Sequence, residues 1–234
     1  MINPCAQLLP VEVIERAKML NVPLICDGIG KAGLDLPNGG CMDAAIMPVE
    51  RGMFMVGTAM TVETANGDNF PIHVASYSTD AAGYVMVIDG KSYTGRAYFG
   101  DLIMGSCKAV GFTGMVVDGM TRDRDGNIDD LDKFPVFSKG FMPRGPIKKD
   151  EGNINTPITC GNVHVEPGDL VMGDSDGVVV VPRAYIEIVL NKAEEKLAYE
   201  DKRNETIAAY TNAKLHGEPL PQLAPKWVLD MLSK

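Results

Sequence analysis

The segment from residue 84 to residue 118 places two apolar runs on either side of a helical pattern, and this order limits the folds open to the chain. The runs are YVMVID (84–89) and GMVVD (114–118), and GDLIMGSCKAV (100–110) between them has the spacing of a helix. A crossover helix between two strands of one sheet makes the strands parallel. The segment therefore predicts a parallel βαβ unit within an α/β fold.

Further short apolar runs, each bounded by Gly, Asp or Pro, extend the predicted sheet. These strand candidates lie at 53–63, 163–165, 170–172 and 178–181. Helices are predicted at 10–20, 71–81 and 183–203, and the Gly- and Pro-rich stretch 38–51 is predicted to be a loop. The chain thus begins with β/α alternation and ends in hairpins followed by C-terminal helices.

Length and charge narrow the class of protein. At roughly 150 residues per domain, 234 residues make one large or one decorated domain the expectation. With a net charge of −9 the chain has no general excess of positive charge that would attract a phosphate backbone, so nucleic acid is not expected as a partner. No apolar stretch approaches the roughly 18 residues of a membrane span, and no membrane partner is expected.

The cysteines argue against both a disulfide framework and a zinc site. They are five in number, scattered, and without a C-x-x-C pair. Free thiols in a reducing cytoplasm fit this usage, so the expected location is cytoplasmic. Cys107 falls inside the predicted helix 100–110 and is expected to be a core residue.

A glycine pattern near the N-terminus imitates a dinucleotide-binding loop. Gly28, Gly30 and Gly33 form G-x-G-x-x-G after an apolar run, and Glu50 lies near the place of a ribose-binding acid. A true site needs a helix that opens at these glycines, whereas Pro37 and the following glycine pair would break one. The pattern is therefore interpreted as a flexible loop.

The βαβ unit carries a more promising group of residues. In such a unit the helix begins, and the second strand ends, at the same carboxyl edge of the sheet, where open α/β sheets bind ligands. The free N–H groups of the first helical turn suit a carboxylate, and Arg122 adds forked donors. Asp123 offers oxygen to a hard cation such as Mg²⁺. These residue types describe a pocket for a metal-chelated 2-oxo acid, whereas spacing alone favours a solvated charged turn at 122–125.

The chain resembles the RraA-like family, whose members include class II pyruvate aldolases that act on 4-hydroxy-4-methyl-2-oxoglutarate and 4-carboxy-4-hydroxy-2-oxoadipate. Its most specific motif is the aldolase signature D-X20-R-D, matched by Asp101, the twenty residues 102–121, and then Arg122 and Asp123. Other matching stretches are GTAMTVE (57–63), YVMVIDG (84–90), FPVFSKGFMP (134–143) and VEPGDLVMGDSDGVVVVP (165–182).

The resemblance implies a fold, a site and a reaction. The fold is a single layered αββα swivelling domain over 24–205, with an N-terminal helical segment (1–23) and a C-terminal extension (206–234) that packs on the body or on a neighbouring subunit. The implied substrate-binding residues are Gly100, Asp101, Leu102, Ile103 and Arg122, of which Asp101 and Arg122 are catalytic, and Asp123 binds Mg²⁺ or Mn²⁺.

The implied activity is cleavage of a 4-hydroxy-2-oxo acid to pyruvate and a second oxo compound, together with oxaloacetate decarboxylation. The family assembles as homotrimers or homohexamers with active sites at subunit interfaces. The motif does not name the base that takes the C4 hydroxyl proton; the alternatives are a metal-activated water and a carboxylate of another subunit, such as Glu50 or Glu63.

Two other functions compete with the aldolase. Some family members are non-enzymatic regulators that bind a ribonuclease or helicase, but such relatives tend to lose the Asp101, Arg122 and Asp123 set that is intact here. A menaquinone methyltransferase is an older label for such sequences, and no glycine-rich loop for an adenosyl cofactor is found in a suitable context.

Three remaining features are expected to be structural. His73 on a predicted helix and His164 in a strand pattern are most simply hydrogen-bonded residues of the fold. Asp174-Ser175-Asp176-Gly177 has acidic spacing like that of a calcium loop but lacks the other loop ligands, so it is predicted to be a hairpin turn.

Overall fold

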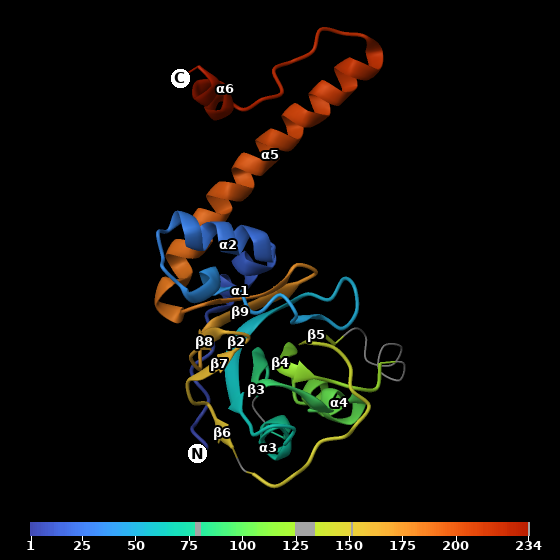
Figure 1. Cartoon of the computed structure of the whole chain (residues 1–234). Helices are drawn as coiled ribbons and strands as arrows, with labels where there is room; N and C mark the ends of the chain where they lie inside the picture. The colour runs from blue at the N-terminus through green and yellow to red at the C-terminus, as the bar shows by residue number, and fades with distance from the viewer. Residues whose placement is uncertain (78–80, 125–133, 151, 234) are drawn as a thin grey trace.

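The computed structural model describes residues 1–77, 81–124, 134–150 and 152–233 (Figure 1). Its helices are α1 (Val11–Lys18), α2 (Val22–Lys31), α3 (Phe70–Ser76), α4 (Asp101–Ala109), α5 (Ile186–His216) and α6 (Lys226–Leu232), with short 3-10 turns η1 (Pro37–Gly40) and η2 (Arg183–Tyr185). Its strands are β1 (Met47–Pro48), β2 (Met55–Glu63), β3 (Tyr84–Ala97), β4 (Gly114–Met120), β5 (Val136–Ser138), β6 (Asn153–Ile154), β7 (Ile158–Cys160), β8 (Val163–Val165), β9 (Leu170–Asp174) and β10 (Gly177–Val181).

The predicted βαβ unit is confirmed. β3 and β4 run parallel in register from Val85 opposite Gly114 to Ile88 opposite Val117, and α4 connects them. β2 also pairs with β3 in parallel, so three adjacent strands share one direction. The carboxyl ends of these strands lie at one edge of the sheet, and the candidate site is built there.

The strands form one mixed sheet that nearly closes on itself. Among the described residues its order is β1-β5-β4-β3-β2-β9-β10, with β6 on β2. The segment before β1 spans the gap between the two ends: Cys41 bridges Val179 of β10, and Met47 then pairs with Ser138 of β5. A sheet curled in this way has an inside, and alternate side chains of each strand point into it.

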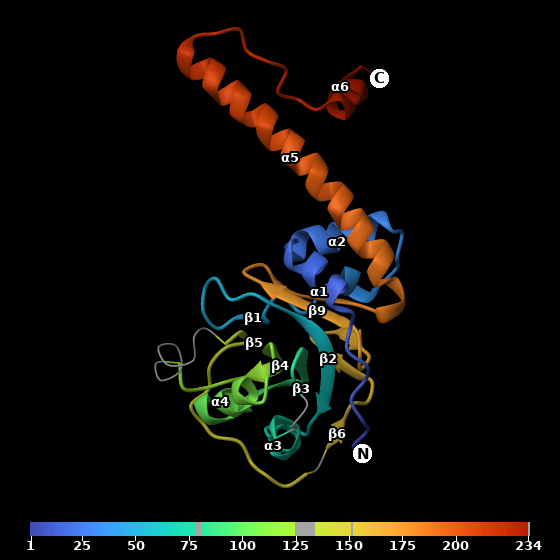
Figure 2. The same cartoon turned by 180° about the vertical axis from the view of Figure 1, so that it is seen from behind.

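Side-chain alternation divides the core into three layers. The inner layer includes Ala59, Val87, Val116 and Phe137, together with the hairpin β7–β8, which fills the interior. A second layer packs α3 and α4 on the outer face of β2–β4. A third packs α1, α2 and the base of α5 on β9 and β10. The helices thus cover the sheet on two sides (Figures 1 and 2).

The interpretation of the glycine pattern as a loop is wrong, because Gly28 and Gly30 lie inside α2. Asn21 caps this helix by accepting a hydrogen bond from the Leu24 amide, and a proline stands in its first turn. At Gly28 a Cβ atom would lie 2.6 Å from the carbonyl oxygen of Val189 in α5. The glycine therefore allows α2 and α5 to pack closely, a tertiary role that local sequence does not reveal.

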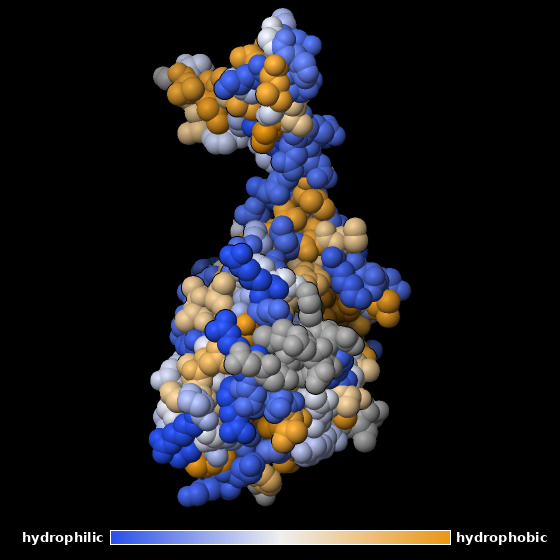
Figure 3. All heavy atoms as spheres, turned by 90° about the vertical axis from the view of Figure 1, so that its right-hand side faces the viewer, coloured by the Kyte–Doolittle hydropathy of each residue, from blue (hydrophilic) through white to orange (hydrophobic). Residues whose placement is uncertain are grey.

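The C-terminal part of the chain forms an arm that leaves the body (Figures 1 and 2). The last predicted helix extends well beyond residue 203, since α5 runs unbroken to His216 and ends at Gly217, which adopts a left-handed conformation. Beyond it α6 folds back toward α5, where the Trp227 indole N–H lies 3.4 Å from the Tyr199 hydroxyl. Hydrophobic surface gathers at the end of the arm (Figure 3), and includes the exposed Leu215 and Trp227.

Within the described ranges, none of the helices is both long and apolar enough to cross a bilayer.

Candidate active site

The first turn of α4 and the segment that follows β4 meet at the carboxyl edge of the sheet. They border a pocket of about 110 Å³. Its lining residues are Asn69, His73, Phe99, Gly100, Asp101, Leu102, Ile103, Arg122, Asp123, Pro146 and Lys148. The structure thus brings together every residue that the sequence singles out for substrate and metal.

Two carboxylates surround the N-terminus of α4. Asp101 accepts a hydrogen bond from the Leu102 amide at 2.8 Å, and the Asp101 amide donates to Oδ2 of Asp123 at 3.3 Å. The N-terminus of a helix favours negative charge, because the backbone dipoles align there. The first two amides of α4 are thus already bonded to carboxylates, which places negative charge at this end of the pocket.

The backbone of Asp123 is held in an uncommon conformation. Its φ angle is 63°, in the left-handed region that residues other than glycine seldom adopt, although Asp and Asn tolerate it best. Tertiary hydrogen bonds fix the preceding residues: the Arg122 amide and the Thr121 hydroxyl both donate to the Phe99 carbonyl. Such local strain is typical of functional sites, where the surroundings determine the position of a side chain.

Glycine at position 100 is a steric requirement of this site. A Cβ atom there would overlap Oδ2 of Asp123 and approach the Cγ atom of Arg122 to 3.0 Å. Gly145 has a similar effect on the other side, since its Cβ would lie 2.9 Å from Nη1 of Arg122. The two glycines leave room for the side chains of Arg122 and Asp123.

Arg122 still has donor capacity available for a ligand. Its Nε atom lies 3.4 Å from Oδ2 of Asp123, in an ion pair too long and poorly aligned to be a hydrogen bond. That Nε atom is buried and has no hydrogen-bond partner in the described part of the chain. A buried donor without a hydrogen-bond partner is costly, so an oxygen atom of a ligand that reached this Nε atom would be bound favourably.

The pocket also contains residues that sequence reasoning missed or treated as structural. His73 of α3 lines it, and burial, helped by nearby Lys148, lowers the pKa of this histidine below its usual 6.5. Asn69 has a buried side-chain oxygen with no partner among the described residues. Asn69 and Lys148 come from loops without a motif, and only the fold brings them to the βαβ edge.

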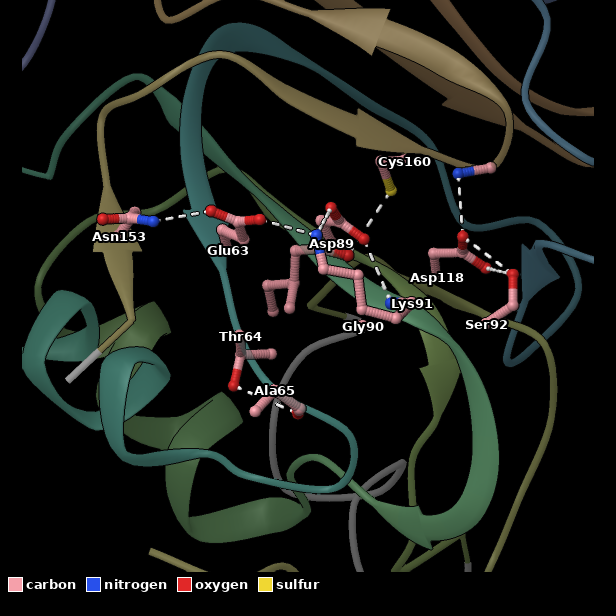
Figure 4. Close-up of polar contacts among 12 residues, drawn as sticks. Glu63, Thr64, Ala65, Asp89, Gly90, Lys91, Ser92, Asp118, Asn153 and Cys160 are labelled. Carbon is pink, nitrogen blue, oxygen red and sulfur yellow. Dashed lines mark hydrogen bonds and ion pairs between the residues drawn. The ribbon is translucent and has the colours of Figure 1, made fainter. Parts of the chain in front are cut away.

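A second polar cluster lies at the carboxyl end of β2 and around residues 89–92 in the middle of β3 (Figure 4). Lys91 makes ion pairs with Asp89 at 2.5 Å and with Glu63 at 2.6 Å, and Asn153 donates to Glu63. Hydrogen bonds from Lys91 and then Asn153 lower the pKa of Glu63. Glu63 is therefore held as a paired anion within its own subunit.

The negative charge of Asp118 is also balanced by a lysine and by hydrogen-bond donors. This buried carboxylate accepts hydrogen bonds from the Ser92 hydroxyl and the Gly161 amide, and pairs with Lys139 at 2.8 Å. Lys91 and Ser92 both have left-handed backbone conformations, which turn the chain within β3, where its register with β4 shifts between Ile88 and Tyr93. Each buried charge of this polar cluster has a partner, and none of its residues lines the pocket at α4. The cluster is therefore assigned a structural role in this part of the sheet.

The other features expected to be structural have structural contacts. Cys107 is fully buried in the layer under α4. The segment 174–177 forms the turn of the β9–β10 hairpin, where Asp174 accepts a hydrogen bond from the Asp176 amide. His164 lies on β8 and pairs with Glu166 at 2.8 Å. Residue 125 lies outside the described residues, so only part of the charged segment 122–125 is seen.

Comparisons with known proteins give this site a family context. The family model described as RraA-like, Aldolase/RraA, matches residues 22–180. A protein of Halalkalibacterium halodurans named "Putative 4-hydroxy-4-methyl-2-oxoglutarate aldolase" is 40% identical over 167 residues, which cover 71% of this chain and 78% of that protein. An uncharacterised protein of Methanocaldococcus jannaschii is 33% identical over 195 residues, covering 81% and 86% of the two chains.

The fold is also found in a solved structure. RraAS2 of Streptomyces coelicolor, described as an unusual member of the RNase ES inhibitor RraA protein family, superposes with a TM-score of 0.74 at 21% identity, over 85% of this chain and 98% of that one. At this identity the likeness concerns the fold alone. The family model and the sequence relatives together establish that the chain belongs to the RraA-like (Aldolase/RraA) family.

Proposed function

We propose that the protein is a divalent-metal-dependent lyase that cleaves a 4-hydroxy-2-oxo acid to pyruvate and a second oxo compound, and that it also decarboxylates oxaloacetate. The observation that carries the proposal is the meeting of an arginine, an aspartate and a helix N-terminus around one pocket of about 110 Å³. That volume suits the pyruvyl part of a substrate. The relatives named as aldolases support the same class of reaction.

The chain's own groups bind and polarise the pyruvyl part. The amides of the first turn of α4 hold the C1 carboxylate, and Arg122 donates hydrogen bonds to the C2 oxygen. When the C3–C4 bond breaks, negative charge develops on that C2 oxygen. A fixed guanidinium stabilises this enolate more strongly than it stabilises the ground state, which is how preorganised charge lowers a barrier. Loss of CO₂ from oxaloacetate gives the same enolate, so one site serves both reactions.

The residues present fit Mg²⁺ or Mn²⁺. Among the described residues no group of three or more His, Cys, Asp and Glu side chains could hold a metal ion, so a closed protein cage is absent from that part of the chain. Mg²⁺ typically uses one or two carboxylates and takes its other ligands from substrate and water. Asp123 supplies one such carboxylate, in a space kept open by Gly100, and Asp101 is adjacent. When bound, the metal adds Lewis-acid polarisation of the carbonyl.

The retro-aldol direction also needs a base for the C4 hydroxyl proton, and we propose that a neighbouring subunit supplies it. Leu102, at the mouth of the pocket, is 82% exposed, which leaves this side open for a second chain in a homotrimer or homohexamer. Glu63 of the same subunit is committed to Lys91 and Asn153. Glu50 of a partner chain remains the other carboxylate candidate.

A coupled assay for pyruvate release tests the proposal. Oxaloacetate and a panel of 4-hydroxy-2-oxo acids are incubated with the protein in the presence of Mg²⁺, Mn²⁺ or EDTA. Because oxaloacetate also loses CO₂ without an enzyme, each rate is compared with that of the same mixture without protein: we expect an excess of pyruvate with either metal and no excess with EDTA. One solved structure with a similar fold is described as the RNA-processing inhibitor RraA. If the protein is inactive on every substrate and binds a ribonuclease, the function is that of a non-enzymatic regulator instead.

A further inference from the structure

Two cysteines that are distant in sequence meet beside the third core layer. Cys26 lies in α2, and Cys41 directly follows the 3-10 turn η1. Their sulfur atoms are 2.9 Å apart, and both side chains are only partly buried. A disulfide bond is about 2.05 Å long, so an approach of roughly 0.9 Å separates this contact from a covalent bond. We propose that Cys26 and Cys41 are a redox modification site, at which a small-molecule disulfide converts the two thiols reversibly into an intramolecular disulfide.

The two thiols differ in reactivity, and this difference assigns their roles. A hydrogen bond from Cys26 lowers the pKa of Cys41 to about 7, against the opposing effect of partial burial. The same hydrogen bond, then burial, raises the pKa of Cys26, and the nearby carboxylates Asp27 and Asp174 add to the effect. A thiolate is the attacking species in disulfide exchange. Cys41 is therefore the nucleophile and Cys26 the resolving thiol.

The exchange proceeds in two balanced steps. The Cys41 thiolate attacks one sulfur of the small disulfide, forms a mixed disulfide and releases the first small thiolate. Cys26 then loses its proton and attacks Sγ of Cys41, which forms the internal bond and releases the second small thiolate. The proton from Cys26 passes to solvent or to a released thiolate. The two protein thiols are oxidised, and the small disulfide is reduced to two thiols.

The new bond would tie α2 to the segment that follows η1, beside the third core layer. Cys41 bridges Val179 of β10, while α2 packs on the base of α5. The bond closes a loop whose two ends, residues 26 and 41, are 15 positions apart in the sequence. Such a loop is predicted to raise the thermal midpoint of a chain of this size by about 5–10 °C. The pocket at α4 does not include either cysteine, so the effect concerns stability.

The other cysteines provide internal controls. Cys107 and Cys160 are buried, and burial raises the pKa of each. Cys5 is exposed, and its sulfur accepts a hydrogen bond from Asn155. A small disulfide that reacts indiscriminately would modify Cys5 first. If only Cys26 and Cys41 react with the small disulfide, the contact between their sulfur atoms is the reason.

The test incubates the full-length protein with oxidised glutathione at pH 7.5 and, in parallel, with dithiothreitol. We expect the oxidised sample to lose two of its five free thiols to one internal bond, to yield a Cys26–Cys41 peptide pair on non-reducing digestion, and to melt about 5–10 °C higher. Dithiothreitol should reverse all three changes. The Cys5→Ser variant should behave in the same way, whereas Cys26→Ser and Cys41→Ser should show no increase in melting temperature. Glutathione retained separately on either cysteine, or five free thiols after oxidation, would overturn the proposal.

Discussion

The amide nitrogen of Asp101 and the Oδ2 atom of Asp123 lie 3.3 Å apart across the N-terminus of α4. The two residues are 22 positions apart in the chain, and the βαβ crossover brings them together. At this distance the hydrogen bond is weak, so the Asp123 carboxylate can exchange the amide for another partner at little cost. The fold thus keeps a carboxylate and an anion-binding helix end within reach of one small ligand.

Removing the charge of Asp123 or Arg122 should abolish most of the activity. Asn tolerates the left-handed conformation of residue 123, so Asp123→Asn removes the negative charge without strain. We expect Asp123→Asn and Arg122→Ala each to lower kcat for pyruvate release by about 10²–10³-fold. Arg124→Ala is the matched control, because that guanidinium stacks on Phe141 at 5.0 Å and does not line the pocket. Unchanged turnover in both site variants would refute the site assignment.

A single methyl group at position 100 should have a similar effect. In Gly100→Ala the new Cβ overlaps Oδ2 of Asp123 and displaces that carboxylate. Since a displacement of about 1 Å can cost roughly 100-fold, we expect a loss of this order in kcat/KM, with an unchanged far-ultraviolet circular dichroism spectrum. Gly30→Ala, where the new Cβ would meet no atom of another element within 4 Å, should retain full activity. Equal activity of the two variants would contradict this steric account.

The parts of the structure that can be predicted from sequence are those set by local periodicity. The apolar runs at 84–89 and 114–118, with a helix between them, are sufficient to place Gly100, Arg122 and Asp123 at one edge. The D-X20-R-D spacing then predicts which residues at this edge bind the substrate and the metal. Both signals are carried by residues of one supersecondary unit, so no long-range contact has to be inferred.

The features that sequence reasoning misses depend on contacts between distant segments. Gly28 and Gly30 are interpreted as loop residues because Pro37 and the glycine pair after it would break a helix that opens there, yet α2 ends at Lys31, before that proline, and packs on α5. Asn69 and Lys148 enter the pocket from loops, and the contact between Cys26 and Cys41 depends on the position of η1. In each case the position of the residue is set by a contact with another helix, strand or loop. The pattern of neighbouring residues along the chain does not predict such a contact.

The two glycines of α2 should respond in opposite ways to alanine. Gly28→Ala forces a Cβ to 2.6 Å from the Val189 carbonyl oxygen, so we expect a loss of about 1–3 kcal/mol in the free energy of unfolding. Gly30→Ala meets open space in a helix, and should gain about 0.4–1 kcal/mol because alanine restricts the unfolded chain. Urea denaturation at pH 7 measures both values. A similar loss in the two variants would show that helix packing is not the reason for Gly28.

The contact between α1 and α5 should make stability depend on pH through Glu194. Arg16 binds both carboxylate oxygens of Glu194, at 2.7 and 3.0 Å, and this hydrogen bonding lowers the pKa of Glu194 below the usual 4.5. A carboxyl group with a lowered pKa in the folded state contributes its stabilisation above the unfolded-state pKa and loses it as the pH falls through the folded-state value. Glu194→Gln should therefore be less stable than the wild type at pH 7, and the difference should shrink as the pH falls below about 4.5.

The size of this effect is limited by solvent. The Glu194 side chain is 42% exposed, so screening holds the expected difference at pH 7 to about 1 kcal/mol or less in the free energy of unfolding. Glu195→Gln is the matched control on the same helix, since Glu195 pairs only with Lys192, one turn away and mostly in solvent, among the described residues. Urea titrations at pH 7 and pH 3.5 should show a difference that depends on pH for Glu194→Gln and almost none for Glu195→Gln. A deficit in Glu194→Gln of equal size at both pH values would mean that the residue acts through packing rather than through its charge.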